Sequence, residues 1–198
     1  NHAEGLRFEQ NRTIARSVKN AQYDWCLGDL KMSGYGSHYF KVIVKGLTGW
    51  FIAAVGAYKH YKDTTYSDPD VWGWSSQNQR YTGGYHKDTG KVTTGWKGDF
   101  TLYFKLDLAR GTLECIYSKN PSLSMICTGM PAGRTWVPHF NLHSAPFSTQ
   151  ASPLTASEFA KCRSTGNWKF DSTYCSNHAE GLRFEQNRTI ARSVKFTI

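Results

Sequence analysis

The chain has 198 residues and a formal net charge of +9, and it is long enough for one domain with a substantial hydrophobic core. Aromatic residues make up 15% of it and 18 residues are glycine, whereas long runs of helix-favouring residues are absent, so the composition favours strands and turns. No apolar stretch reaches the length of a membrane-spanning helix, and the sequence therefore predicts no membrane span.

The two ends of the chain carry the same sequence. Residues 1–19 read NHAEGLRFEQNRTIARSVK, and residues 177–195 repeat them letter for letter. A single fold unit uses each edge strand once, so one copy is extra. The duplication is explained by a tandem array cut just past one unit, by a chain that exchanges its end strand, or by an engineered end segment. The copies diverge at residues 20–22 and 196–198, which argues against the array.

Short strands separated by turns are predicted along most of the chain. The clearest is 100–108, where apolar residues alternate with polar ones, as in a strand with one face on a core. The run 50–56 is almost wholly apolar, as expected of a strand covered on both faces. In chain order the expected strands are 6–8, 13–18, 38–45, 50–56, 71–74, 100–108, 112–117 and 134–142.

Between these strands the sequence predicts loops. Residues 57–70 are polar and rich in tyrosine, 83–95 are rich in Gly, Lys and Thr, and 144–157 are rich in Ser, Thr, Ala and Pro. Pro138 implies that its strand lies at an edge or forms a bulge. Residues 157–162 are expected to form a single helical turn.

The order of these segments resembles the SPRY domain family. The matching stretches are FEQNRTIAR at 8–16, SG at 33–34 before HYFKV at 38–42, GWFIAAVG at 49–56, WGW at 72–74, WKGDF at 96–100 running into LDLARGTL at 106–113, and WVPHF at 136–140. The stretch 96–113 is the most specific of them. Residues 144–176 have no counterpart in the family pattern.

The resemblance implies an all-β fold, a bent two-sheet antiparallel β-sandwich with little helix. On this basis residues 1–176 form the SPRY-like domain, and residues 177–198 are the duplicated copy of 1–19 followed by a Phe-Thr-Ile tail. SPRY domains are usually non-enzymatic recognition modules within larger proteins, often ubiquitin-ligase adaptors, channels or scaffolds. Their ligand surface is built from variable loops at one end of the sandwich.

The tyrosine-rich loop 57–70 is the first candidate for such a surface, because tyrosine offers a large contact area at low entropic cost. The SPRY topology would bring side chains from two later segments near it. The candidate contact residues are Tyr58, Tyr61, Asp63, Tyr66, Arg80, Arg134 and Trp136. The tryptophans expected in the core are Trp50, Trp72, Trp74 and Trp96.

No arrangement of residues predicts an enzyme. His139 and His143 are four apart on an expected strand and its following loop, where that spacing does not converge as it does on a helix. Asp99 and Asp107 are expected to bond to turn backbone or to end a strand. No GxSxG, P-loop or HExxH motif occurs, and Cys26 has no histidine nearby. We therefore expect no catalytic residue, no metal and no cofactor.

The cysteines and the N-glycosylation sequons indicate in which cellular compartment the protein is expected. There are five cysteines without a CxxC pair, so a zinc site is not predicted, and reduced buried thiols suit an intracellular, cytoplasmic protein. The sequons at Asn11 and Asn187 leave a secreted protein as the alternative.

These observations lead to a non-enzymatic module that binds a short peptide or loop of a partner protein. A basic surface also permits a nucleic-acid or anion-binding domain, although no nucleic-acid motif is present and solubility explains the charge. A lectin-like carbohydrate binder rests on fold analogy alone. The duplicated end adds self-association by end-strand exchange, because two identical strand pairs compete for one place.

Overall fold

The computed structural model describes residues 6–10, 14–17, 24–59, 61, 65–88, 95–143, 147–164, 182–185 and 190–193. The strands are β1 (Leu6–Glu9), β2 (Ile14–Ser17), β3 (Asp24–Leu27), β4 (Ser37–Leu47), β5 (Trp50–Ala57), β6 (Val71–Ser75), β7 (Gln79–Thr82), β8 (Tyr85–Asp88), β9 (Gly98–Asp107), β10 (Thr112–Tyr117), β11 (Asn120–Thr128), β12 (Trp136–His143), β13 (Ser148–Pro153), β14 (Leu182–Glu185) and β15 (Ile190–Ser193). The helical elements are α1 (Ala156–Ser164) and the short 3₁₀ turn η1 (Thr65–Ser67).

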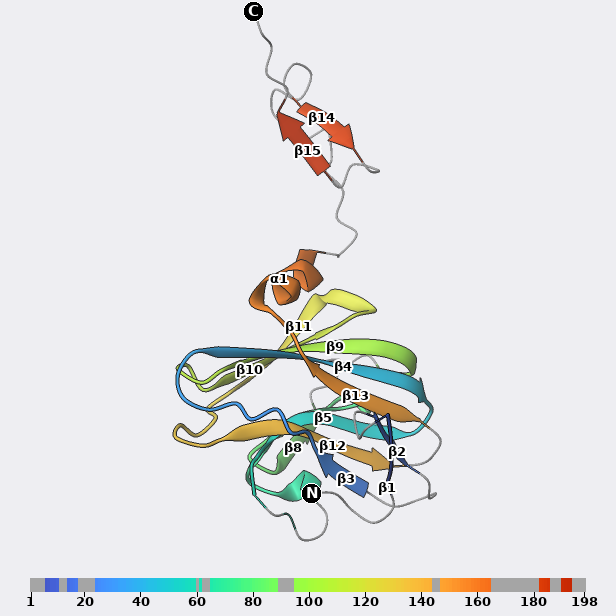
Figure 1. Cartoon of the computed structure of the whole chain (residues 1–198), viewed down its shortest axis with the longest axis vertical. Coiled ribbons are helices and arrows are strands. Elements are labelled where there is room, and N and C mark those ends of the chain that lie inside the picture. The colour runs from blue at the N-terminus through green and yellow to red at the C-terminus, as the bar shows by residue number, and fades with distance from the viewer. Residues whose placement is uncertain are drawn as a thin grey trace, which may run out of the picture.

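Two antiparallel sheets stack face to face, as the sequence predicts (Figure 1). The seven-stranded sheet has the order β1-β2-β13-β4-β9-β10-β11, and the six-stranded sheet has the order β3-β12-β5-β6-β7-β8. The main hydrophobic core fills the space between them. The expectation of an all-β sandwich with little helix is confirmed.

Alternation along the strands decides which side chains enter the core. On β9 the side chains of Phe100, Leu102, Phe104 and Leu106 are buried, while the residues between them are partly exposed. Strand β5 is buried at every position because it lies inside its sheet between β12 and β6. One face of β5 meets the main core, and the other joins a second apolar cluster on the outer face of the six-stranded sheet.

Five strands of the sandwich and the helix differ from the sequence-based expectation. Strands β3, β7 and β11 lie outside the expected strands, β8 lies in a predicted loop, and β13 forms within the polar stretch 144–157. The segments of β8, β11 and β13 lack a strong apolar period. Their strand conformation is decided by backbone pairing with neighbouring strands. Helix α1 spans Ala156–Ser164 and is thus longer than the predicted turn.

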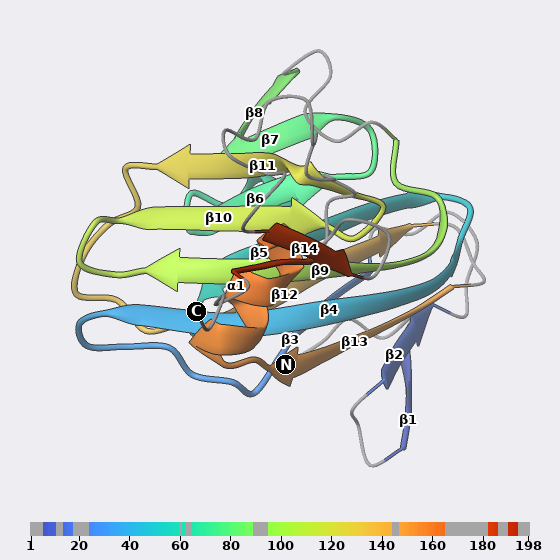
Figure 2. The same ribbon diagram turned by 90° about the horizontal axis from the view of Figure 1, so that it is seen from above.

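Helix α1 begins with a reciprocal cap. The backbone N–H of Glu158 donates to Thr155 Oγ1 at 3.2 Å, and the backbone N–H of Thr155 donates to Glu158 Oε2 at 2.8 Å. The helix lies on the outer face of the seven-stranded sheet (Figures 1 and 2), where Phe159 packs on Tyr39 with ring centroids 5.5 Å apart.

Pro138 was expected at an edge or bulge, and this prediction is wrong, because β12 is paired on both sides. The carbonyl of Pro138 accepts a hydrogen bond from the N–H of Gly28, just beyond the end of β3. The nitrogen and carbonyl of one strand residue point to the same side. The missing N–H of Pro138 therefore faces Gly28, and the reciprocal bond of this pair is absent where β3 ends.

The duplicated segments form two hairpins with one register. In the first copy β1 pairs with β2, and in the second copy β14 pairs with β15 with the same partners 176 positions later. The first copy takes the edge of the seven-stranded sheet, where β2 pairs with β13. Among the described strands, β14 and β15 pair only with each other. None of the helices in the described ranges is both long and apolar enough to cross a membrane.

Candidate binding surface

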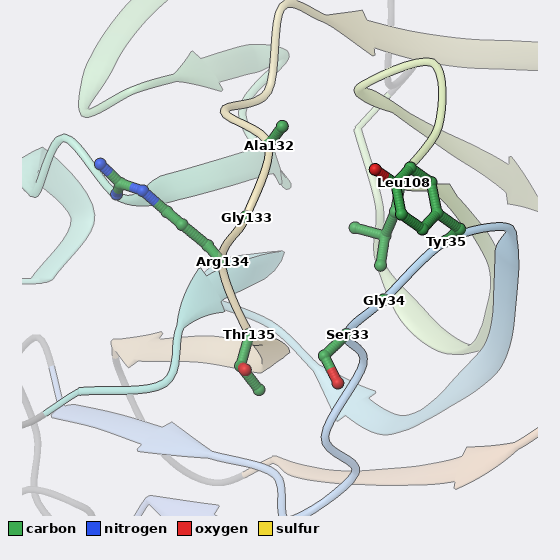
Figure 3. A pocket seen from close by; sticks show the side chains of 8 residues that line it. All are labelled: Ser33, Gly34, Tyr35, Leu108, Ala132, Gly133, Arg134 and Thr135. Atoms are coloured by element: carbon green, nitrogen blue, oxygen red, sulfur yellow. The ribbon is translucent and has the colours of Figure 1, made fainter.

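A pocket of about 220 Å³ opens where three connecting segments meet at one end of the sandwich. The segment before β4 supplies Ser33, Gly34 and Tyr35, the turn after β9 supplies Leu108, and the segment before β12 supplies residues 132–135. Figure 3 shows Ser33–Tyr35 along one side of the pocket and Ala132–Thr135 along the other.

Backbone hydrogen bonds hold these segments together. Met32 and Trp136 exchange two N–H···O bonds of 2.8 Å, and the N–H of Leu108 donates to the carbonyl of Gly36 at 2.9 Å. The N–H of Tyr58 donates to the carbonyl of Thr135 at 2.8 Å, which ties the loop after β5 to the same group. Since these bonds need no side chain, the loops are positioned by the fold, and binding would cost little ordering entropy.

Two exposed tyrosines flank the pocket segments. Tyr35 is 95% exposed, and Tyr58 is 52% exposed with the Lys31 ammonium 4.2 Å from the centre of its ring. Tyr58 was among the predicted contact residues, whereas Tyr35 was missed. Its sequence signal is an aromatic residue between Gly34 and Gly36, which adopt φ of 82° and 97°, a backbone conformation that favours glycine.

Arg134 is engaged in an ion-pair network. Asp70, whose side chain is 15% exposed, pairs with Arg134 and accepts a hydrogen bond from Lys59 Nζ at 2.7 Å. Lys59 Nζ also contacts Asp68 at 2.8 Å. Figure 3 shows the Arg134 side chain pointing away from the pocket. Arg134 therefore joins the segment before β12 to the loop after β5, and its charge is already neutralised.

Two of the predicted contact residues are buried. Tyr61 is 2% exposed, donates to the carbonyl of Ala57 at 3.0 Å, and packs its ring on His139 with centroids 5.1 Å apart. Burial raises the pKa of the Tyr61 hydroxyl. Trp136 is fully buried in the main core. Neither ring is available to a partner in this conformation, because both are buried. The sequence did not show this, since composition marks a loop as aromatic but does not show which rings turn inward.

The remaining predicted residues have intermediate or undescribed positions. Tyr66 is half-buried and packs on Trp50 with ring centroids 5.8 Å apart. Arg80 is half-buried on β7, opposite Trp74 of β6. Asp63 lies outside the described residues. Of the predicted contact residues that the structure describes, Tyr58 and Arg134 lie at the surface of the pocket end, beside Tyr35.

The cysteines and histidine of the core have strongly perturbed pKa values because they are buried. Burial raises the pKa of Cys26 and of Cys127 to about 12, so both thiols stay protonated at neutral pH. Burial lowers the pKa of His139 to about 3, so its ring stays neutral. Within the described ranges, no group of three or more His, Cys, Asp and Glu residues is placed to hold a metal ion.

No protein-family model matches the sequence, and no curated protein is significantly similar to it. The solved SPRY domain of human HERC1 superposes with a TM-score of 0.60 at 12% identity, over 78% of this chain and 99% of that one. The chain has a SPRY fold. The PSpry domain of TRIM65 superposes with a TM-score of 0.55 at 13% identity, over 76% of this chain and 85% of that one. Stonustoxin superposes with a TM-score of 0.57 at 15% identity, over 75% of this chain and 25% of that one. In this SPRY fold the stretches 38–42 and 49–56 lie on β4 and β5, and 96–113 covers β9, the turn after it and the start of β10.

Proposed function

We propose that this chain is a protein-interaction module that captures a short peptide or loop of a partner at the pocket end of the sandwich. The observation that carries the proposal is the pairing of a pocket fixed by backbone bonds with two exposed tyrosines, Tyr35 and Tyr58. Aromatic anchors beside a pocket are typical of the residues that supply most binding energy at interfaces.

Arg134 and its acidic partner Asp70 would act on the ligand indirectly, through the shape of the pocket. Arg134 holds the segment before β12 through Asp70, so it supports the wall of the pocket. Tyr61 and Trp136, buried beneath this end, would act as support for the loops and not as contact residues.

Peptides selected from a random display library against the full chain test this surface. We expect Tyr35→Ala and Tyr58→Ala each to weaken the selected peptides by about tenfold, since loss of an aromatic anchor costs more than about 1 kcal/mol. Isothermal titration calorimetry measures the affinity. Ile126→Ala is the matched control, because Ile126 is also a large exposed apolar residue (49%) but lies on the outer face of β11.

Equal affinity of the two tyrosine variants and the unchanged chain would overturn the proposed surface. Salt separates this function from the anion-binding alternative. A tyrosine-anchored peptide should keep most of its affinity as salt rises, whereas a nucleic acid or acidic polymer bound by charge would lose affinity steeply.

We also propose that chains associate at high concentration through the duplicated end, by exchange of the β14–β15 hairpin. The supporting observation is that both copies form the same hairpin while one place at the β13 edge is filled. Deleting residues 177–198 should leave the fold intact and abolish this association, measured by light scattering across a concentration series. A truncated chain that fails to fold would show that the second copy, not the first, closes the sheet.

A further inference from the structure

The β13 edge is a docking place for one hairpin. Strand β2 pairs with β13 through Ile14, Ala15 and Arg16, with Ala15 opposite Thr149. Ala15 is 6% exposed and joins the main core, and the cross-strand neighbour Phe8 packs against that core. The first hairpin therefore supplies ladder hydrogen bonds to β13 and apolar side chains that cover the core at this edge.

The second hairpin matches this place in every residue. Residues 177–195 repeat residues 1–19, and Phe184 pairs with Ala191 as Phe8 pairs with Ala15. Because the side chains and the pairing register are the same, the two hairpins can make the same contacts with β13. The contact free energy then favours neither, and occupancy depends on how each hairpin is tethered.

The second hairpin is tethered closely enough to reach the place on its own chain. Helix α1 contacts β9 and β11, and the connection would enter the place of β1, which lies four positions from β9 in the sheet order. At about 4.8 Å per strand this separation across the sheet is roughly 20 Å. The connection 165–181 can extend over on the order of 55 Å, so its length allows the hairpin to reach β13.

We propose that the β13 edge is a binding site for the β14–β15 hairpin of the same chain, which takes the place of β1–β2 when the first hairpin leaves. This inference rests on the exchange of end strands proposed above, and it names the occupant. The connection 18–23 is shorter than 165–181, so the first hairpin is favoured in the undisturbed chain. A tethered hairpin has a local concentration of the order of millimolar, which outweighs hairpins from neighbours at micromolar protein.

The consequence is a sandwich that stays closed when its first hairpin is removed. A partner that captured residues 1–19, or cleavage before β3, would release the first hairpin without exposing the core beside Ala15. The chain would thus hold a reserve copy of its own edge.

A cycle of substitutions in the full chain tests this inference. Ala15→Arg places a charged side chain at the buried position of the first hairpin, and Ala191→Arg makes the same change in the second. At micromolar concentration we expect each single variant to lose about 2 °C of Tm or less. The double variant should lose about 10 °C, far more than the sum, because no copy can then fill the place.

Hydrogen exchange of β13 gives the direct readout, since its peptide is unique whereas the two copies give the same peptides. Among Ser148–Gln150, the amides that point to the place of the hairpin should stay protected in both single variants and exchange in the double variant, whereas amides that bond to β4 should stay protected throughout. The control pair Arg7→Ala and Arg183→Ala changes the corresponding positions opposite the buried face, where Arg7 is exposed, and should leave Tm and protection unchanged.

Three results would overturn the inference. Ala15→Arg as unstable as the double variant would show that the second hairpin does not fill the place. A double variant as stable as the unchanged chain would show that the place needs no hairpin. An Ala15→Arg chain that is stable only as a dimer would assign the place to a neighbour's hairpin, which rejects the same-chain occupant but keeps the proposed self-association.

Discussion

Replacing Trp136 with alanine should lower the free energy of unfolding by about 3–5 kcal/mol, the cost of removing a large side chain from a close-packed core. Trp136 is fully buried at the start of β12, between the two sheets. Its backbone bonds to Met32 would remain, so the loss comes from the side chain. Urea unfolding followed by circular dichroism measures the change without depending on the deleted fluorophore.

Tyr58→Ala is the matched control for this change, because Tyr58 is an aromatic residue at the same end but is 52% exposed. It should cost less than about 1 kcal/mol. The two variants should therefore separate stability from binding: Trp136→Ala destabilises the chain, and Tyr58→Ala weakens a ligand. An equal loss of stability in both would contradict the assignment of Trp136 to the core.

Acidification should destabilise the fold through His139. Its pKa is lowered from 6.5 to about 3, first by burial, against the opposing effects of the Asn141 hydrogen bond and the negative charge of Asp68. The unfolded chain takes up a proton below pH 6.5 while the native ring stays neutral. The stabilising effect is thus fully present above pH 6.5 and falls by about 1.4 kcal/mol per pH unit down to about pH 3.

The pH dependence of urea midpoints between pH 7 and 4.5 measures this loss, in a range above the ordinary carboxyl pKa values. His139→Gln, which cannot titrate, should flatten the profile, whereas His38→Gln on β4 should retain it. A profile that is equally steep in His139→Gln would assign the acid sensitivity to other groups. The close fit around His139 supports its burial, since a Cβ on Gly56 would lie 2.6 Å from His139 Nδ1.

The elements that the sequence predicts well are those whose local pattern and tertiary environment agree. The alternation in 100–108 and the apolar run 50–56 correspond to β9 and β5, with the predicted faces buried. Strand β13 was missed because Ser, Thr and Gln do not mark a strand; its ladder partners β2 and β4 decide it. Such a segment is a strand only because the neighbouring strands β2 and β4 offer backbone N–H and C=O groups to pair with.

The candidate surface was predicted less well than the fold. The loop after β5 was identified from its tyrosines, but the loop packs Tyr61 inward and leaves Tyr58 outside. Tyr35, the most exposed large hydrophobic residue among the described residues, lies in a glycine-rich segment that has no periodic signal. Whether a loop ring is buried in the core or exposed to a partner depends on residues that are distant in the sequence and close in the fold. The local sequence pattern does not show which residues these are.

By itself, the sequence determined an all-β fold and the identity of the two end segments, because strand periodicity and repetition are local properties of the chain. The two-sheet sandwich was implied by the resemblance to the SPRY family, and the structure has it. Only the tertiary structure decided that the first copy lies against β13, and that backbone bonds from Met32, Leu108 and Tyr58 gather the loops into one pocketed end. Two identical hairpins have identical contact energies, so their sequence cannot choose between them; the connections to the rest of the fold do.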